Sequence, residues 1–172
     1  SRSVRSANFS PDGTQVVSAS IDGTVKLWQV SNGQLIKSFD GHSRWVNSAN
    51  FSPDGTQVVS ASSDGTVKLW QVSNGELIQS FDGHSRGVNS ANFSPDGILV
   101  VSASWEGTVK LWQVSNGQLI QSFDGHSSSV ISANFSPDGT QVVSASDDGT
   151  VKLWRVSNGQ LIQSFDGHSG WV

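Results

Sequence analysis

The chain has 172 residues, of which 35% are hydrophobic, and it contains no cysteine or methionine. The lack of cysteine excludes disulfides and thiolate metal sites, and a formal net charge of −4 gives no general attraction to nucleic acid or anionic lipid. No apolar run approaches the roughly 20 residues of a membrane-spanning helix. No signal-like segment opens the sequence, so we expect a cytoplasmic location and no membrane partner.

A unit of 42 residues recurs along the whole chain. Tryptophan marks one position of every copy, at Trp28, Trp70, Trp112 and Trp154. The copies cover approximately residues 1–42, 43–84, 85–126 and 127–168, and residues 169–172 begin a fifth. Self-similarity at this period predicts an array of structural repeats that form one domain over residues 1–172.

Each copy predicts four short strands, which in the second copy cover residues 46–51, 58–62, 66–72 and 77–81. Tight turns separate them. Pro53-Asp54-Gly55 combines a preset φ, a side chain that bonds its own backbone and a residue tolerant of positive φ. Asp64-Gly65 and Asn74-Gly75 are typical hairpin turns. No segment has the apolar spacing of a helix, so the fold class is all-β.

Four strands per unit at a fixed period are typical of a propeller blade. The recurring motifs Gly-His, Phe-Ser-Pro-Asp-Gly, Ser-Ala-Ser-x-Asp-Gly-Thr-Val-Lys-Leu-Trp and Gly-x-Leu-Ile resemble the WD40-repeat β-propeller family over the whole chain. The resemblance implies a β-propeller of four-stranded antiparallel blades, four to this chain. The chain departs from the family at the residue after each tryptophan, where Gln29, Gln71, Gln113 and Arg155 replace the usual aspartate.

The resemblance also implies a buried hydrogen-bonded set in each blade, formed by a histidine, a serine, the turn acid and the tryptophan. The sets are His42, Ser60, Asp64, Trp70; His84, Ser102, Glu106, Trp112; and His126, Ser144, Asp148, Trp154. Ser18, Asp22 and Trp28 lack an upstream histidine, and His168 lacks a downstream set. We expect the extra methylene of Glu106 to push its carboxylate past His84 or to shift the turn.

Serine, histidine and aspartate together also suggest a catalytic triad, but a triad needs one reacting cleft. Here the set recurs in every blade and its hydroxyl bonds tryptophan, so we expect a structural role and no enzyme activity. The four histidines are spaced by 42 residues, without the paired spacing of metal ligands. No cofactor is implied.

Differences among the copies concentrate after Gly-His and before the turn acid, at one end of a blade. By resemblance this is the top face, where the family holds partners. The candidate binding rim is Arg2, Arg5, Ile21, Arg44, Trp45, Asn47, Ser63, Arg86, Asn89, Trp105, Ile131 and Asp147. Tryptophan and arginine are enriched at interaction hot spots, whereas drift on exposed loops would give the same variation.

Three functions remain open: a non-enzymatic scaffold for a protein or peptide, a carbohydrate-binding propeller, and a designed or recently amplified array without a selected ligand. Glu106, Asp147 and the net charge disfavour nucleic acid. Four blades form half of an eight-bladed ring, so we expect a homodimer that closes the ring. His168 of one copy would complete the set of Ser18 in the other, and the two ends of the chain would compete for one slot.

Overall fold

The computed structural model describes residues 3–168, which form sixteen β-strands and no helix. The strands build four antiparallel sheets of four strands, each in sequential order. Blade 1 contains β1 (Val4–Phe9), β2 (Gln15–Ser20), β3 (Val25–Gln29) and β4 (Leu35–Phe39). Blade 2 contains β5 (Val46–Phe51), β6 (Gln57–Ser62), β7 (Val67–Gln71) and β8 (Leu77–Phe81). Blade 3 contains β9 (Val88–Phe93), β10 (Leu99–Ser104), β11 (Thr108–Gln113) and β12 (Leu119–Asp124). Blade 4 contains β13 (Val130–Phe135), β14 (Gln141–Ser146), β15 (Thr150–Arg155) and β16 (Leu161–Asp166).

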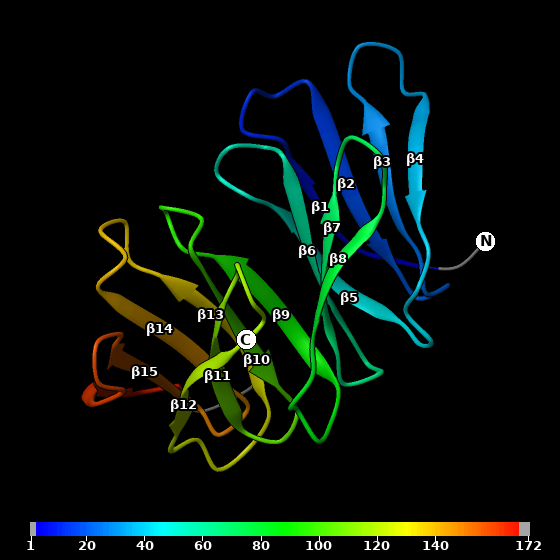
Figure 1. Ribbon diagram of the computed structural model, residues 1–172. Helices are drawn as coiled ribbons and strands as arrows, with labels where there is room; N and C mark the ends of the chain where they lie inside the picture. Colours follow the sequence, from blue (N-terminus) through cyan, green and yellow to red (C-terminus); the bar gives the residue numbers. More distant parts are fainter. Residues whose placement is uncertain (1–2, 169–172) are drawn as a thin grey trace.

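The predicted propeller architecture is therefore confirmed. Figure 1 shows the four sheets side by side in a fan that runs from blade 1, in blue, to blade 4, in orange and red. Only neighbouring blades share extensive contacts. None of the described residues forms a helix that is long and apolar enough to cross a membrane.

Apolar side chains project from both faces of the inner blades, because alternate residues of a strand point to opposite sides. Between blades 1 and 2, Leu27 and Phe39 of the first blade pack against Val58 and Trp70 of the second. The next residue along, Val59, faces the other way and packs against blade 3. The same residues repeat between blades 3 and 4, so each junction is built from one recurring set of contacts.

The innermost strands are also joined by side chains. Ser6 and Asn8 of β1 bond the backbone of Ala49 in β5: the Ala49 N–H donates to Ser6 Oγ at 3.1 Å, and Asn8 Nδ2 donates to the Ala49 carbonyl at 2.9 Å. Asn50 and Asn92 make the equivalent bonds to the next blades. This arrangement satisfies backbone groups that face no strand partner, which explains the serine and asparagine of every first strand.

The two outer faces of the fan lack a neighbouring blade in the structure. Val4 is 62% exposed, whereas its equivalents in the other blades are fully buried. On blade 4, Phe165 is 50% exposed, whereas Phe81 of blade 2 is fully buried. The described residues of blades 1 and 4 therefore do not close on each other, and two apolar surfaces stay open.

Candidate functional site at the top face of the first three blades

A hydrogen-bonded chain links four side chains in blade 2. His42 Nδ1 lies 2.9 Å from Asp64 Oδ2, and His42 Nε2 lies 2.7 Å from Ser60 Oγ. The indole of Trp70 donates to Ser60 Oγ at 2.8 Å. Blades 3 and 4 repeat this chain with their own predicted residues.

The chemistry of the four groups fixes the direction of the chain. The carboxylate of Asp64 can only accept, so His42 Nδ1 carries the proton and Nε2 accepts from Ser60. The oxygen of Ser60 then accepts from the indole of Trp70. Ser60 is fully buried and both sides of its hydroxyl are engaged, so it has no access to a substrate. The chain holds the loop before β5 against the sheet.

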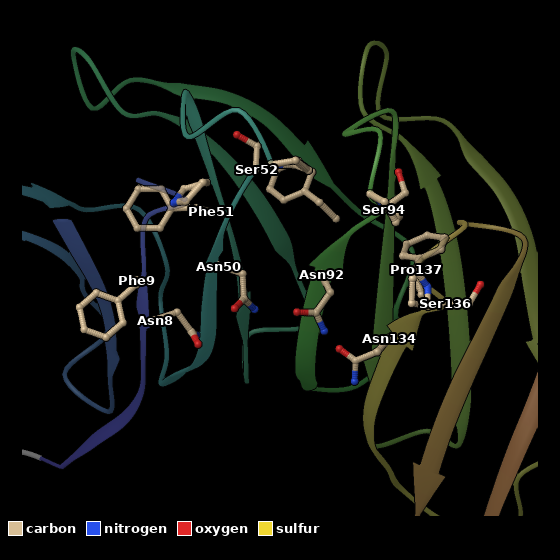
Figure 2. Close-up of a pocket in the computed structure, with 15 residues that line it drawn as sticks. Asn8, Phe9, Asn50, Phe51, Ser52, Asn92, Ser94, Asn134, Ser136 and Pro137 are labelled. Atoms are coloured by element: carbon tan, nitrogen blue, oxygen red, sulfur yellow. The ribbon is translucent and has the colours of Figure 1, made fainter. Parts of the chain in front are cut away.

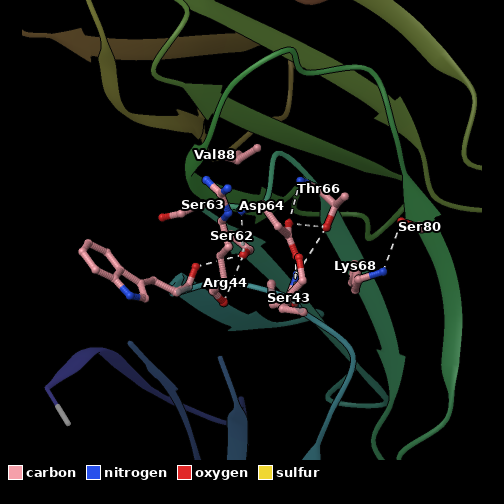
Figure 3. A network of polar contacts seen from close by, with 12 residues as sticks. Ser43, Arg44, Ser62, Ser63, Asp64, Thr66, Lys68, Ser80 and Val88 are labelled. Carbon is pink, nitrogen blue, oxygen red and sulfur yellow. Dashed lines mark hydrogen bonds and ion pairs between the residues drawn. The ribbon is translucent and has the colours of Figure 1, made fainter. Parts of the chain in front are cut away.

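The turn acid of blade 2 is bound from several sides. Figure 3 shows Asp64 between Ser43 and Thr66. The Ser43 N–H donates to one oxygen at 3.0 Å, and the Thr66 N–H and hydroxyl donate to the other at 2.9 and 2.7 Å. Burial by itself would raise the pKa of Asp64, but the hydrogen bonds from His42 and Thr66 outweigh it and hold the pKa well below its usual value.

Blade 3 carries Glu106 in place of this aspartate, and the longer side chain still reaches His84, with Oε1 at 2.7 Å from Nδ1. The hydroxyl of Ser85 also donates to it. Burial would raise the pKa of Glu106, but hydrogen bonds from Ser85, His84 and Thr108 lower it to about 2. The expected displacement past His84 is not seen. The difference lies at the turn, where the Thr108 hydroxyl bonds Glu106 but no backbone bond matches that of Thr66.

Blade 1 holds the incomplete set. The indole of Trp28 donates to Ser18 Oγ at 2.8 Å, as in the other blades, but no described imidazole contacts Ser18 or Asp22. His168 lies exposed at the far end of blade 4, with its carbonyl over Gly149. The structure thus keeps these predicted partners at opposite ends of the fan.

The varying positions of the candidate rim meet at the top face because the backbone joins them. The Ser63 N–H, at the turn between β6 and β7, donates to the carbonyl of Trp45 at 2.8 Å. The same bond joins Trp105 to Gly87 at 2.9 Å. It recurs as Ile21 to Ser3 and Asp147 to Ser129. Each blade therefore presents one residue from its turn beside one from its preceding loop.

A hollow of about 470 Å³ lies at this face between blades 1, 2 and 3. Its lining is Ile21, Asp22, Gly23, His42, Ser43, Arg44, Trp45, Ser63 and Trp105. Six of these nine residues occupy positions that differ among the copies: Ile21, Asp22, Arg44, Trp45, Ser63 and Trp105. Trp45 is 53% exposed and Trp105 is 41% exposed. Sequence variation and hollow shape therefore coincide at one place, which we call the top hollow.

Two predicted rim residues, Asn47 and Asn89, form hydrogen bonds that join neighbouring blades. Asn47 donates to Ser63 Oγ at 3.1 Å and to the Val88 carbonyl of the next blade at 2.8 Å. Asn89 bridges blades 3 and 4 by donating to Ser129 Oγ at 3.2 Å and to the Val130 carbonyl at 2.8 Å, both in blade 4.

The remaining rim residues lie outside the lining of the top hollow. Arg5 and Ile131 occupy the place of these two asparagines in blades 1 and 4, and both are exposed. Arg86 and Asp147 are exposed as well. Arg2 lies outside the described residues. So do Ser1 and residues 169–172, which belong to the two chain ends that we expect to compete for one slot.

The sequence analysis did not predict that Trp105 and Gly87 pack against each other at the rim. Trp105 lies over Gly87, so closely that a Cβ at Gly87 would stand 2.9 Å from the indole. The indole N–H of Trp105 also donates to Asn89 Oδ1. Blade 3 has the only tryptophan at the turn position and the only glycine at the loop position among the four copies. A large residue at the turn position together with the smallest residue at the loop position, both in the same copy, could have indicated this contact.

A second hollow, of about 440 Å³, lies along the inner strands at the Phe-Ser-Pro turns. Figure 2 shows Asn8, Asn50, Asn92 and Asn134 in a row along it. Its lining comes from the Asn-Phe-Ser-Pro segments, whose sequence is identical in all four copies. It carries none of the variation that marks the top hollow.

Comparison with known proteins bears on the repeats. The family model described as WD domain, G-beta repeat matches residues 1–29, 33–71, 75–113 and 117–155. A stretch of 38 residues is 47% identical to the guanine nucleotide-binding protein subunit beta-5b of Danio rerio. That stretch covers 22% of this chain and 10% of the relative, so the chain matches about a tenth of that protein's length.

Proposed function

Because this chain belongs to the WD40-repeat family, we propose that it is a non-enzymatic scaffold whose top hollow binds a protein or peptide. One observation carries the proposal: six lining residues come from positions that vary among otherwise near-identical copies. Variation confined to exposed loops on a rigid frame is typical of binding surfaces. The relative's printed name, a guanine nucleotide-binding protein subunit, is compatible with a role in protein assemblies.

The lining favours recognition over chemistry. Trp45, Trp105 and Arg44 belong to residue types that dominate the energy of interfaces. A volume of about 470 Å³ lies within the usual range of small-ligand sites, about 300–1,000 Å³. The polar chain below, through His42 and Ser60, fixes the loop that carries Arg44 and Trp45. Binding would therefore require little ordering of the protein, which favours affinity.

Selection from a displayed random peptide library, with a glycan array in parallel, tests this function. We expect peptides that bind the wild type and lose affinity on Trp45→Ser. The control is Arg155→Gln, which copies the glutamine of the other blades at a distant exposed site. Selected peptides that bind the Trp45→Ser variant equally well would contradict the top hollow. Binding of glycans alone would support the carbohydrate-binding alternative. Absence of binding in both assays would support the array without a selected ligand.

We also infer that a second copy of the chain covers the two open faces. Blade 4 presents Val143 and Phe165 where the inner blades bury the same residue types. Blade 1 presents Val4 and Trp28, the types that receive them at every inner junction. Two copies related by a two-fold axis would cover both faces with identical contacts and would bring His168 of one copy to Ser18 of the other.

The cytoplasmic location also stays a prediction.

Light scattering at micromolar concentration tests this pairing. We expect the mass of two chains, because large open apolar faces favour association. The mass of one chain with a cooperative melt would contradict it, and a mass above two chains would indicate another form of closure.

A further inference from the structure

We propose that the end of blade 4, residues 165–168, is a docking segment that receives Trp28 and Ser18 of another copy of the chain. Gly167 decides whether the two surfaces can meet. This inference rests on the proposed pairing and names the residues that make it specific. The junctions inside the chain carry the argument, because each of them shows the same contact already formed.

At every inner junction a tryptophan ring lies against a glycine of the preceding blade. A Cβ at Gly41, at the end of blade 1, would lie 2.9 Å from Cη2 of Trp70 in blade 2. At the next two junctions, Gly83 and Gly125 stand in the same relation to a tryptophan, at 3.1 Å. Non-bonded carbon atoms prefer separations of about 3.5–4.0 Å. Only glycine therefore leaves room for the ring at these positions.

Gly167 occupies this position at the end of blade 4, but its contact is open. A Cβ at Gly167 would have no heavy atom of residues 3–168 within 4 Å, apart from its chain neighbours. Phe165 is 50% exposed, whereas Phe39 of blade 1 is 1% exposed and its ring centroid lies 5.8 Å from that of Trp70. The equivalent tryptophan, Trp28, lies in β3 of blade 1, at the opposite end of the fan (Figure 1). A second copy therefore has to supply it.

The backbone of His168 already has the position that the inner histidines have. A Cβ at Gly149 would lie 3.5 Å from the His168 carbonyl, the same distance as between the equivalent glycine of blade 1 and the carbonyl of His42. From that position His42 reaches into the next blade and contacts Ser60 Oγ at 2.7 Å. Blade 4 thus presents His168 toward a blade that would bring Ser18. A side chain placed in advance loses little freedom on binding, which favours association.

The receiving side on blade 1 is also formed before a partner arrives. The indole of Trp28 donates to Ser18 Oγ at 2.8 Å, the same distance as in the complete sets. The N–H and hydroxyl of Thr24 hold Asp22 by its Oδ1 at 3.0 and 2.7 Å. In blade 2 the other oxygen of the turn acid accepts from histidine, and no imidazole within residues 3–168 makes that bond to Asp22. Blade 1 therefore lacks the histidine that the docking segment carries.

The substitution Gly167→Ala tests the inference with a single methyl group. This group meets no described side chain of its own copy, so the variant should melt at the wild-type temperature where single chains prevail. In the pair the methyl group would clash with Trp28 of the second copy, and close packing leaves the ring little room to move. A two-fold pair contains this contact twice. The dissociation constant measured by sedimentation should therefore rise at least about a hundredfold, about tenfold for each contact.

Two double-mutant cycles locate the contact. Trp28→Phe removes the distal part of the indole and weakens pairing by itself, but on that background Gly167→Ala should change the dissociation constant by less than about threefold. His168→Ala should weaken the pairing of the wild type and have a clearly smaller effect once Ser18→Ala has removed its hydrogen-bond partner. Additive effects in either cycle would overturn the proposed contact.

Matched controls separate pairing from folding. Gly41→Ala places the same methyl group at a junction that is already formed, so it should lower the melting temperature of the single chain. Glu76→Gln copies the glutamine of the other blades at an exposed site of blade 2 and should change neither the melting temperature nor the dissociation constant. A melting temperature of Gly167→Ala as low as that of Gly41→Ala would overturn the inference, because it would show that Gly167 is packed within its own copy.

The outcomes distinguish the docking segment from the pairing on which it rests. A wild type with the mass of two chains and an equal dissociation constant for Gly167→Ala would overturn the docking segment and leave the pairing in place. A wild-type mass above two chains that falls to one chain on Gly167→Ala would support the docking segment and contradict closure by two copies. A wild type that stays a single chain at high micromolar concentration would overturn both.

Discussion

Blades 2 and 3 each lie between two other blades, whereas blades 1 and 4 have one open face, and almost the same sequence occupies all four positions. Val59 in blade 2 is fully buried, but Val143, its equivalent in blade 4, is 37% exposed. Trp112 is 1% exposed, and Trp28 is only half-buried. The comparison separates what a repeat contributes by itself from what its neighbour contributes. Matched substitutions in inner and outer blades can measure the second contribution.

The largest effect should come from a charge on the face that joins two blades. We expect Val59→Asp to prevent folding, because an unpaired buried carboxylate costs about as much as a small protein's whole stability. Val143→Asp should leave the chain folded and reduce its mass in light scattering from two chains to one. Circular dichroism reports folding in both variants. Retention of the double mass by Val143→Asp would break the proposed pairing.

Loss of an indole should rank second. Trp112→Ala removes a fully packed ring and its bond to Ser102, and it should cost about 3–5 kcal/mol of unfolding free energy. Trp28→Ala should cost clearly less at concentrations where single chains prevail and about the same where copies pair. Denaturant titrations over a range of protein concentration measure both. A gap between the two variants that does not change with concentration would show that Trp28 remains uncovered.

Acid should weaken the polar set of blade 3 first. Burial lowers the pKa of His84 below its ordinary 6.5, and the nearby Glu106 only partly offsets this. The neutral His84 therefore stabilises the fold above pH 6.5, and this stabilisation is lost as the pH falls. Glu106, with a pKa lowered from 4.5 to about 2, contributes stability above 4.5 that is lost as pH falls toward 2.

Melting temperatures between pH 8 and pH 2 should therefore decline in two stages, about the ordinary pKa values of histidine and of carboxyl groups. Asp64→Asn should flatten the second stage, whereas Asp22→Asn, in the blade without histidine, should change it little. Equal effects of the two substitutions would remove the distinction between complete and incomplete sets.

The smallest effect compares two inner blades. Glu106→Asp would place a carboxylate where Asp64 accepts from the Thr66 N–H, and the Thr108 N–H would gain the same partner. The variant should be more stable by about 0.5–1.5 kcal/mol, the net value of one hydrogen bond. Differential scanning calorimetry can resolve this change. An unchanged or lower melting temperature would mean that the Ser85 contacts of Glu106 compensate fully.

Local chemistry and period made much of the fold predictable. The Asp-Gly and Pro-Asp-Gly turns lie where the sequence indicates, with positive φ at Gly55 and Gly65. The short segments between these turns lie in strands, as the sequence analysis predicts. The polar sets were assigned by family resemblance, and their donors and acceptors match one another in the structure.

The sequence by itself determined the strands, the turns and the residues that each blade offers to a neighbour, because these depend on short-range geometry and recur every 42 residues. Only the tertiary structure decided which of four equivalent side chains is buried, since Trp28 and Trp112 stand in nearly the same local sequence. It also decided that Trp105 rests on Gly87 and that Ile21, Trp45 and Trp105 share one hollow. The contact of Trp105 with Gly87 lies within blade 3, whereas the hollow joins three blades, so its geometry follows from how the blades pack and not from any single repeat.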